Sequence, residues 1–199
     1  LSTVHMKGRE DAEEIRRLLS LCGIRVISMP GGGSSWEDIM DAPSASLNIV
    51  VRDELGLSLA KQMERDFGTP YMSCGLPYGT DGTMAWLSEI IEKLRAGELT
   101  RASHEAAKLK EFLLRKGNNL ESLWGPLWFD AVLISAPPSE ALGIAEAIRS
   151  EWIDTARLCI HAQCETEKST PAADAIRVVM KNEKEIAKDY EDWQGGLVL

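Results

Sequence analysis

Residues able to bind a ligand occur where short apolar runs end. The apolar run "LNIVV" (47–51) is followed at once by Arg52, and a helical pattern begins at the next residue. Open α/β sheets bind ligands outside the carboxyl ends of their strands, where we expect Arg52 to lie exposed. A guanidinium stays protonated and donates hydrogen bonds, so it can hold a carboxylate or a cofactor's acidic group but cannot ligate a metal cation. An ion pair with Asp53 or Glu54 is the alternative.

A second candidate is the glycine-rich segment "GGGSS" that precedes another predicted helix. Its residues Gly31, Gly32, Gly33 and Ser34 would offer backbone N–H groups to an anion at a helix N-terminus. We therefore count them with Arg52 as candidate cofactor-binding residues. The segment matches neither GxGxxG nor the P-loop pattern, so it gives nucleotide binding little support. A tight turn with a serine cap explains the same residues without a ligand.

The chain has four cysteines, and one of them belongs to the same expected ligand edge. Cys74 follows the predicted strand "PYMS" and is a candidate cofactor-binding thiol. Cys159 and Cys164 flank His161 in "CIHAQC", but neighbouring strand residues alternate between faces and no second pair of ligands completes a site. We interpret these two as structural, Cys22 as part of a helix core face, and predict no metal ligands in the chain.

Composition narrows the class of protein. A net charge of −9 argues against nucleic acid as a partner and favours a small-molecule ligand or a basic protein surface. No apolar run approaches the roughly 18 residues that span a bilayer, and no signal peptide is visible. Four cysteines are too few for a disulfide scaffold, which favours reduced thiols and a cytoplasmic protein. The chain opens on "LSTVHM" and stops at "GGLVL", so we interpret it as part of a longer protein.

These candidates need strands and helices to position them, and the two alternate along the chain. The first half predicts strands 1–6, 24–30, 47–51 and 70–73, and helices 9–22, 53–67 and 81–95. A charged helical stretch, 98–117, follows. The second half predicts strands 129–135, 156–161 and 175–180, helices 139–152 and 182–192, and a polar loop over 163–173. This rhythm predicts an α/β fold with two doubly wound Rossmann-like units, whose parallel sheets are joined by a helix. The expected units are 1–97 and 128–199, the second incomplete, with a connecting segment over 98–127.

Three predicted helices carry apolar stripes that should pack on a core. The stripes are Ile15, Leu18, Leu19 and Cys22 in the first helix, Leu55, Leu59 and Met63 in the next, and Leu87, Ile90, Ile91 and Leu94 in the last.

An ordered series of stretches resembles the nitrogenase component 1 family. That family includes nitrogenase molybdenum–iron protein subunits, cofactor-assembly scaffolds and nitrogenase-like tetrapyrrole reductases. The stretches are "REDAEEIRRLLSLCGIRV", "GGGSSWEDI", "ASLNIVVRDELGLSLAKQMERDFGTPY", "LPYGTDGTMAWLSEI" and "EKEIAKDYEDWQGGLVL". The resemblance runs almost end to end and is weakest over 98–128 and 163–175. It implies three α/β units in the whole subunit, of which this chain resembles the second and most of the third.

The resemblance also carries functional implications. The family's first unit supplies cysteines for an iron–sulfur cluster at a subunit interface, and nothing in this chain matches that unit. Catalytic nitrogenase subunits have a cofactor-ligating cysteine where this chain has Arg52. Cofactor-bearing subunits also have an arginine in the loop that in this chain reads Pro137, Pro138, Ser139 and Glu140. A nitrogen-reducing active subunit is therefore not expected.

The resemblance implies a subunit of a nitrogenase-like oxidoreductase that receives electrons from an ATP-driven iron–sulfur reductase. Its partners would be a homologous component 1 subunit, that reductase, and a small-molecule substrate or cofactor. An iron–sulfur cluster or metallocluster is expected in the full-length complex and none in this fragment, which should be inactive alone. Two alternatives stay open: a non-catalytic scaffold for metallocluster assembly, and a generic Rossmann-type ligand-binding domain. Catalytic residues are not assigned.

Overall fold

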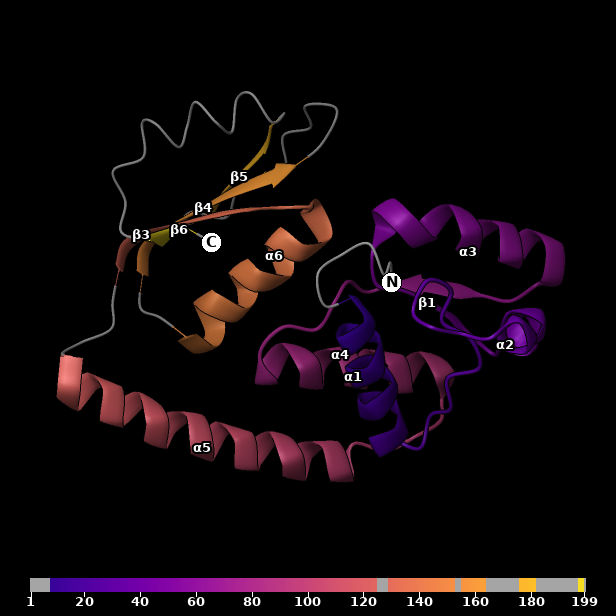
Figure 1. Cartoon of the computed structure of the whole chain (residues 1–199), viewed down its shortest axis with the longest axis horizontal. Helices are drawn as coiled ribbons and strands as arrows, with labels where there is room; N and C mark the ends of the chain where they lie inside the picture. The colour runs from indigo at the N-terminus through magenta and orange to yellow at the C-terminus, as the bar shows by residue number, and fades with distance from the viewer. Residues whose placement is uncertain (1–7, 125–128, 153–154, 164–175, 182–196, 199) are drawn as a thin grey trace. The chain divides into compact units, whose positions relative to one another are not determined.

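The computed structural model describes residues 8–124, 129–152, 155–163, 176–181 and 197–198 (Figure 1). The predicted strand 1–6, most of the loop 163–173 and the helix 182–192 lie outside these residues. The chain divides into two compact units. The first unit contains Leu1–Leu76 and Thr83–Leu109, and the second contains Pro77–Gly82 and Lys110–Leu199. The domain limits expected from the sequence stay a prediction.

In the first unit, residues 8–76 and 83–109 form a pair of short parallel strands and several helices. Its elements are α1 (Gly8–Leu21), α2 (Trp36–Asp41), the 3₁₀ turn η1 (Ala42–Ser44), β1 (Asn48–Val50), α3 (Asp53–Phe67) and β2 (Tyr71–Ser73). Helix α4 (Thr80–Leu94) and helix α5 (Thr100–Trp124) each begin in one unit and end in the other. Helix α3 ends at Gly68, whose φ of 73° is the left-handed conformation that glycine adopts without strain.

Residues 24–30 differ from the prediction, because they form no strand. Their apolar side chains Ile24, Val26 and Met29 nevertheless pack against the core of the first unit. Alternating apolar residues indicate that one side of an extended segment is buried. They do not indicate whether a neighbouring strand pairs with that segment by backbone hydrogen bonds, so residues 24–30 can be buried without forming a strand.

The core of the first unit forms where α1 and α4 meet β2. Its buried members are Ile15, Leu19, Cys22, Met72, Trp86, Leu87, Ile90 and Ala102. The stripes predicted on the first and last of the three helices therefore face the core, as expected. Leu87 and Ile90 have no exposed surface, and burial of such a side chain stabilises the fold by about 1.5–3 kcal/mol.

The stripe predicted on α3 is wrong. Leu55 and Leu59 are 53% and 47% exposed, while Ala60 is buried. Gly56 lies so close to β1 that a Cβ atom there would be 3.2 Å from Val50 Cγ1. Small residues let a helix approach a strand closely, so α3 turns Gly56 and Ala60 toward the sheet and leaves Leu55 and Leu59 outside.

The described residues of the second unit form a four-stranded sheet. Its elements are β3 (Phe129–Ala136), α6 (Pro138–Ala147), the π-helical turn η2 (Ile148–Trp152), β4 (Thr155–Gln163), β5 (Ile176–Lys181) and β6 (Leu197–Val198). The strand order is β5-β4-β3-β6 and every pairing is parallel. Helix α6 packs along β3 and β4 (Figure 1), with Ala141, Ala145 and Ile148 buried. The predicted fold class, α/β units with parallel sheets, is confirmed.

Candidate functional site

The carboxyl ends of β1 and β2 form the edge where the sequence predicts ligand binding. Val50 lies opposite Ser73 in the parallel register, and the Cys74 N–H donates to the Val50 carbonyl at 3.2 Å. Arg52 and Cys74 therefore leave neighbouring strands at the same edge. The Ser73 hydroxyl donates to the Asp53 carboxylate, which links the two chain segments again.

Arg52 is buried rather than exposed, with 6% of its surface accessible. It is the residue before the first turn of α3, with extended φ and ψ of −143° and 107°. Its carbonyl oxygen accepts hydrogen bonds from Leu55 N (3.2 Å) and Gly56 N (2.9 Å). The expectation of an exposed strand-end arginine is thus wrong. The strand places this residue at the edge, and the chain continues directly into α3.

Cys74 is a half-buried thiol in an environment that opposes ionisation. Burial raises its pKa to about 12; the nearby negative charges of Glu89 and Asp53 add to the effect, while a hydrogen bond with Trp86 works against it. Trp86 Nε1 also donates to the Gly75 carbonyl at 3.1 Å. The thiol is therefore protonated at neutral pH. It can donate a weak hydrogen bond, but it is a poor nucleophile.

The glycine-rich turn is held by local contacts. Gly31 and Gly33 have φ of 73° and 88°. These values lie in the left-handed region, which glycine adopts without strain, so the turn favours glycine at both positions. Gly32 is buried, and a Cβ atom on it would lie 2.8 Å from Met29 Cγ and 3.1 Å from Ala12 Cβ. Met29 N donates to Ser34 Oγ at 2.6 Å, and Gly32 N donates to the Met29 carbonyl at 2.8 Å.

The serine after this turn caps α2. Ser35 Oγ accepts from Asp38 N at 3.1 Å, and the Asp38 carboxylate accepts from Ser35 N at 2.9 Å, which is a complete capping box. A turn with a serine cap therefore accounts for these contacts. The glycine turn, residues 31–34, lies against Met29 and Ala12, whereas Arg52 and Cys74 follow neighbouring strands at one edge. A ligand role for all six residues stays a prediction.

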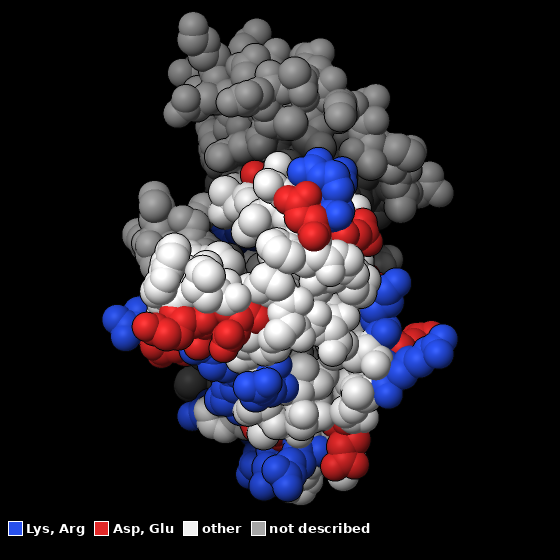
Figure 2. Space-filling view, turned by 90° about the vertical axis from the view of Figure 1, so that its right-hand side faces the viewer, with Lys and Arg blue, Asp and Glu red and all other residues white. Residues whose placement is uncertain are grey.

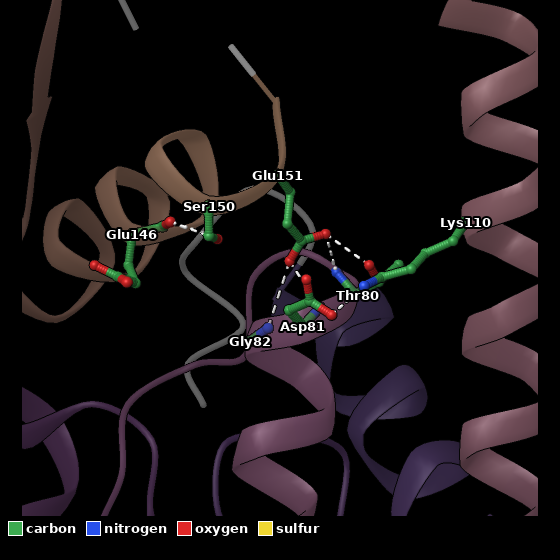
Figure 3. A network of polar contacts seen from close by, with 7 residues as sticks. All are labelled: Thr80, Asp81, Gly82, Lys110, Glu146, Ser150 and Glu151. Carbon is green, nitrogen blue, oxygen red and sulfur yellow. Dashed lines mark hydrogen bonds and ion pairs between the residues drawn. The ribbon is translucent and has the colours of Figure 1, made fainter. Parts of the chain in front are cut away.

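A polar network that the sequence reasoning missed lies in the second unit (Figure 3). The Glu151 carboxylate, in η2, accepts hydrogen bonds from Thr80 N (2.7 Å), Thr80 Oγ1 (2.6 Å) and Asp81 N (2.7 Å). The glycines of "YGTDGT" indicate a tight helix start at this point. No local spacing signals the partner, because Glu151 lies 71 positions away from Thr80.

Charge on the described surface is mixed. Figure 2 shows a face on which basic and acidic side chains alternate, with broad uncharged areas between them. No group of three or more His, Cys, Asp or Glu side chains in the described part of the chain is arranged to hold a metal ion. Among the helices that the structure describes, none combines the length and the apolar character needed to cross a bilayer.

The fold and this strand edge define an α/β protein built from parallel-sheet units, with a buried arginine after a strand. A family model described as nitrogenase component 1 type oxidoreductase matches residues 2–122. The chain therefore belongs to this family, and the resemblance identified from the sequence is confirmed. It is an oxidoreductase family, of which the chain's curated relatives are nitrogenase-like members.

Two curated relatives illustrate the match. One subunit of the light-independent protochlorophyllide reductase from Angiopteris evecta is 38% identical over 88 residues, which is 44% of this chain and 17% of the relative. The nitrogenase iron-molybdenum cofactor biosynthesis protein NifE from Clostridium pasteurianum is 34% identical over 108 residues, which is 54% of this chain and 22% of the relative. The matches thus span about a fifth of each relative.

Solved structures agree on the fold. Nitrogenase Cp1 at pH 5 superposes with a TM-score of 0.60 at 21% identity, covering 96% of this chain and 38% of that one. Nitrogenase Cp1 at pH 6.5 gives a TM-score of 0.62 at 16% identity, covering 100% of this chain and 50% of that one.

Proposed function

We propose that this chain is part of a nitrogenase-like oxidoreductase subunit that accepts electrons from an ATP-driven iron–sulfur reductase. Its family membership supports the oxidoreductase class. The observation that carries the ligand assignment is Arg52, a permanent positive charge buried at the carboxyl edge of β1 and β2. This edge is where open α/β sheets bind their ligands.

The ligand we propose at this edge is anionic. A buried guanidinium interacts with a carboxylate more strongly than an exposed one, because little water screens the pair. The protonated Cys74 thiol on the neighbouring strand end is a weak donor toward the same ligand. The backbone N–H groups of Gly31, Gly33 and Ser34 would add donors in a complex where the turn faces the ligand; the Gly32 N–H already donates to the Met29 carbonyl.

The described donors do not fit direct ligation of a metallocluster. Arg52 has no lone pair to give a metal, and the Cys74 thiol, with a pKa of about 12, is not an available thiolate. A metallocluster in the full-length complex supplies electron storage. At this edge, Arg52 and the Cys74 thiol would hold it by hydrogen bonds to an acidic group of the cofactor. These residues would form no bonds to its metal atoms.

The proposed partners are a homologous component 1 subunit, the ATP-dependent iron–sulfur reductase, and a small-molecule substrate or cofactor. The proposed setting is the cytoplasm, where reduced thiols and oxygen-sensitive clusters persist. The isolated 199-residue chain should be inactive, because it covers only about a fifth of its curated relatives.

A second candidate is a non-catalytic scaffold for metallocluster assembly. The match to NifE, a cofactor biosynthesis protein by name, supports it. A site in which Arg52 holds an acidic group without ligating metal would suit transient storage of a cofactor.

Mixing the full-length protein with its reductase separates these functions. The full-length protein, with any co-purifying subunit, would be mixed anaerobically with reduced iron–sulfur reductase and ATP. Oxidation of the reductase would be followed by stopped-flow absorbance. ATP-dependent oxidation followed by repeated turnover supports the oxidoreductase. Transfer of a cluster to an apo-acceptor without turnover supports the scaffold. If neither turnover nor cluster transfer is observed, both proposed functions are rejected.

A further inference from the structure

Glu151 joins two distant parts of the second unit. Its carboxylate spans the first turn of α4, accepting from Thr80 N, Thr80 Oγ1 and Asp81 N, with a longer contact from Gly82 N at 3.4 Å. The first N–H groups of a helix have no partner within the helix. A carboxylate there gains both charge-assisted hydrogen bonds and the favourable end of the helix dipole.

The backbone before α4 is shaped to admit this carboxylate. Gly79 has φ of 70°, and a Cβ atom at this residue would lie 2.8 Å from Glu151 Cδ. Any side chain at position 79 would therefore collide with the Glu151 carboxyl group. The absence of a side chain at Gly79 thus leaves room for the Glu151 carboxylate.

The charged and polar groups around the contact have partners of their own. Asp81 turns its own carboxylate to Lys110 of α5, which forms an ion pair with it. On the side of α6, Ser150 Oγ donates to the Glu146 carbonyl at 2.8 Å (Figure 3). Burial pushes the pKa of Glu151 up, but the hydrogen bonds from Thr80, Asp81 and Gly82 outweigh it and hold the pKa below its usual value.

We propose that Glu151 is an intramolecular latch that fixes the segment Pro77–Gly82 in the second unit. The latch is closed while the ionised carboxylate occupies the N–H groups of Thr80 and Asp81. It opens when that carboxylate is protonated or removed, which leaves the first turn of α4 without a cap. This device is independent of the ligand proposed at Arg52.

Amide hydrogen exchange tests the latch directly, because the protected groups are the amides of Thr80 and Asp81. The full chain would be compared with Glu151→Ala and Glu151→Gln by peptide-resolved mass spectrometry. We expect exchange over residues 80–82 to accelerate at least about tenfold in Glu151→Ala, and less in Glu151→Gln, which keeps one acceptor. Added formate should restore protection in Glu151→Ala, because a free carboxylate can occupy the vacated position.

Two controls keep the result specific. Glu146→Ala removes a nearby carboxylate on α6 and should leave residues 80–82 as protected as in the unmodified chain. Amides of β4 should exchange slowly in every variant, which reports an intact sheet. If Glu151→Ala does not fold, the exchange rates of Glu151→Gln test the latch instead, because that substitution changes only the charge and one hydrogen-bond acceptor. Unchanged exchange over 80–82 in Glu151→Gln, or acceleration in Glu151→Ala that formate does not reverse, overturns the proposal.

Discussion

Val50 of β1 lies directly opposite Ser73 of β2 in a parallel register. The register places the residues that follow each strand, Arg52 and Cys74, at one edge of the sheet. Helix α3 begins immediately after Arg52, and only 6% of the surface of Arg52 is exposed. Arg52 can therefore have a structural role as well as the proposed ligand role. Variants that change the volume and the charge of its side chain separately are needed to distinguish the two roles.

Replacement of Arg52 tests its structural contribution. Arg52→Ala removes a buried side chain and its packed methylene groups, so we expect the free energy of unfolding to fall by about 1–3 kcal/mol. Arg52→Met keeps most of the volume without the charge and should cost less. Urea denaturation of the 199-residue chain, followed by circular dichroism, measures both. Equal stability of the Ala variant and the unmodified chain would show that the buried guanidinium adds nothing to the fold.

Gly32 should resist substitution because of its neighbours. A Cβ atom there would approach Met29 Cγ to 2.8 Å and Ala12 Cβ to 3.1 Å. We expect Gly32→Ala to destabilise the chain by about 1–3 kcal/mol through overpacking. Gly117→Ala is the matched control, since a Cβ atom at this position in α5 would meet no atom within 4 Å, and it should stabilise by about 0.5–1 kcal/mol. Differential scanning calorimetry distinguishes the two, and similar melting temperatures would contradict the close packing around Gly32.

Cys74 should react slowly with alkylating agents. Its pKa of about 12, against an ordinary value of 9.0, leaves roughly a thousandfold less thiolate at pH 8 than an ordinary thiol has. Labelling by iodoacetamide, quantified for the peptide that contains Cys74, should keep accelerating as pH rises beyond about 10. A rate that levels off near the ordinary thiol pKa would mean that the thiol ionises normally and would reopen thiolate ligation at this edge.

Acid should weaken the contribution of Glu151 to stability. Its pKa in the folded chain lies below the ordinary 4.5, so the contribution is fully present above the unfolded pKa and is lost as pH falls through the folded pKa. The difference in unfolding free energy between the unmodified chain and Glu151→Gln should be constant from about pH 6 upward and shrink below about pH 4.5. Urea titrations across this range measure it. A difference that does not change with pH would exclude an ionised carboxylate at the start of α4.

Much of the architecture could be predicted from periodicity. Ile15, Leu19, Leu87 and Ile90 repeat at helical spacing and do face the core. Leu59 repeats in the same way yet stays outside, because Gly56 and Ala60 bring the other face of α3 against β1. Spacing reveals an apolar stripe but not which face of the helix packs closest.

The candidate site was predictable only in part. Placing Arg52 and Cys74 at one edge follows from parallel pairing of consecutive strands, which the strand–helix rhythm indicates. The burial of Arg52 does not follow, since the exposure of one side chain depends on tertiary packing that the strand–helix pattern does not specify. The contact of Glu151 with Thr80 was beyond prediction, because it joins residues 71 positions apart without any spacing rule.

The proposal that Arg52 holds an anionic ligand in the full-length nitrogenase-like subunit is the central one. Native mass spectrometry of the anaerobically purified full-length complex measures it most directly, comparing the unmodified protein with Arg52→Lys, Arg52→Met and Arg52→Ala. We predict a bound ligand whose binding weakens by about 1.5–3 kcal/mol in the Met and Ala variants and is retained in part by Lys, which keeps the charge but loses the fork of donors. Arg52→Cys should bind metal weakly without creating nitrogen reduction. Unchanged ligand occupancy and turnover in Arg52→Ala, together with a lower melting temperature, would contradict the claim and make Arg52 a structural residue.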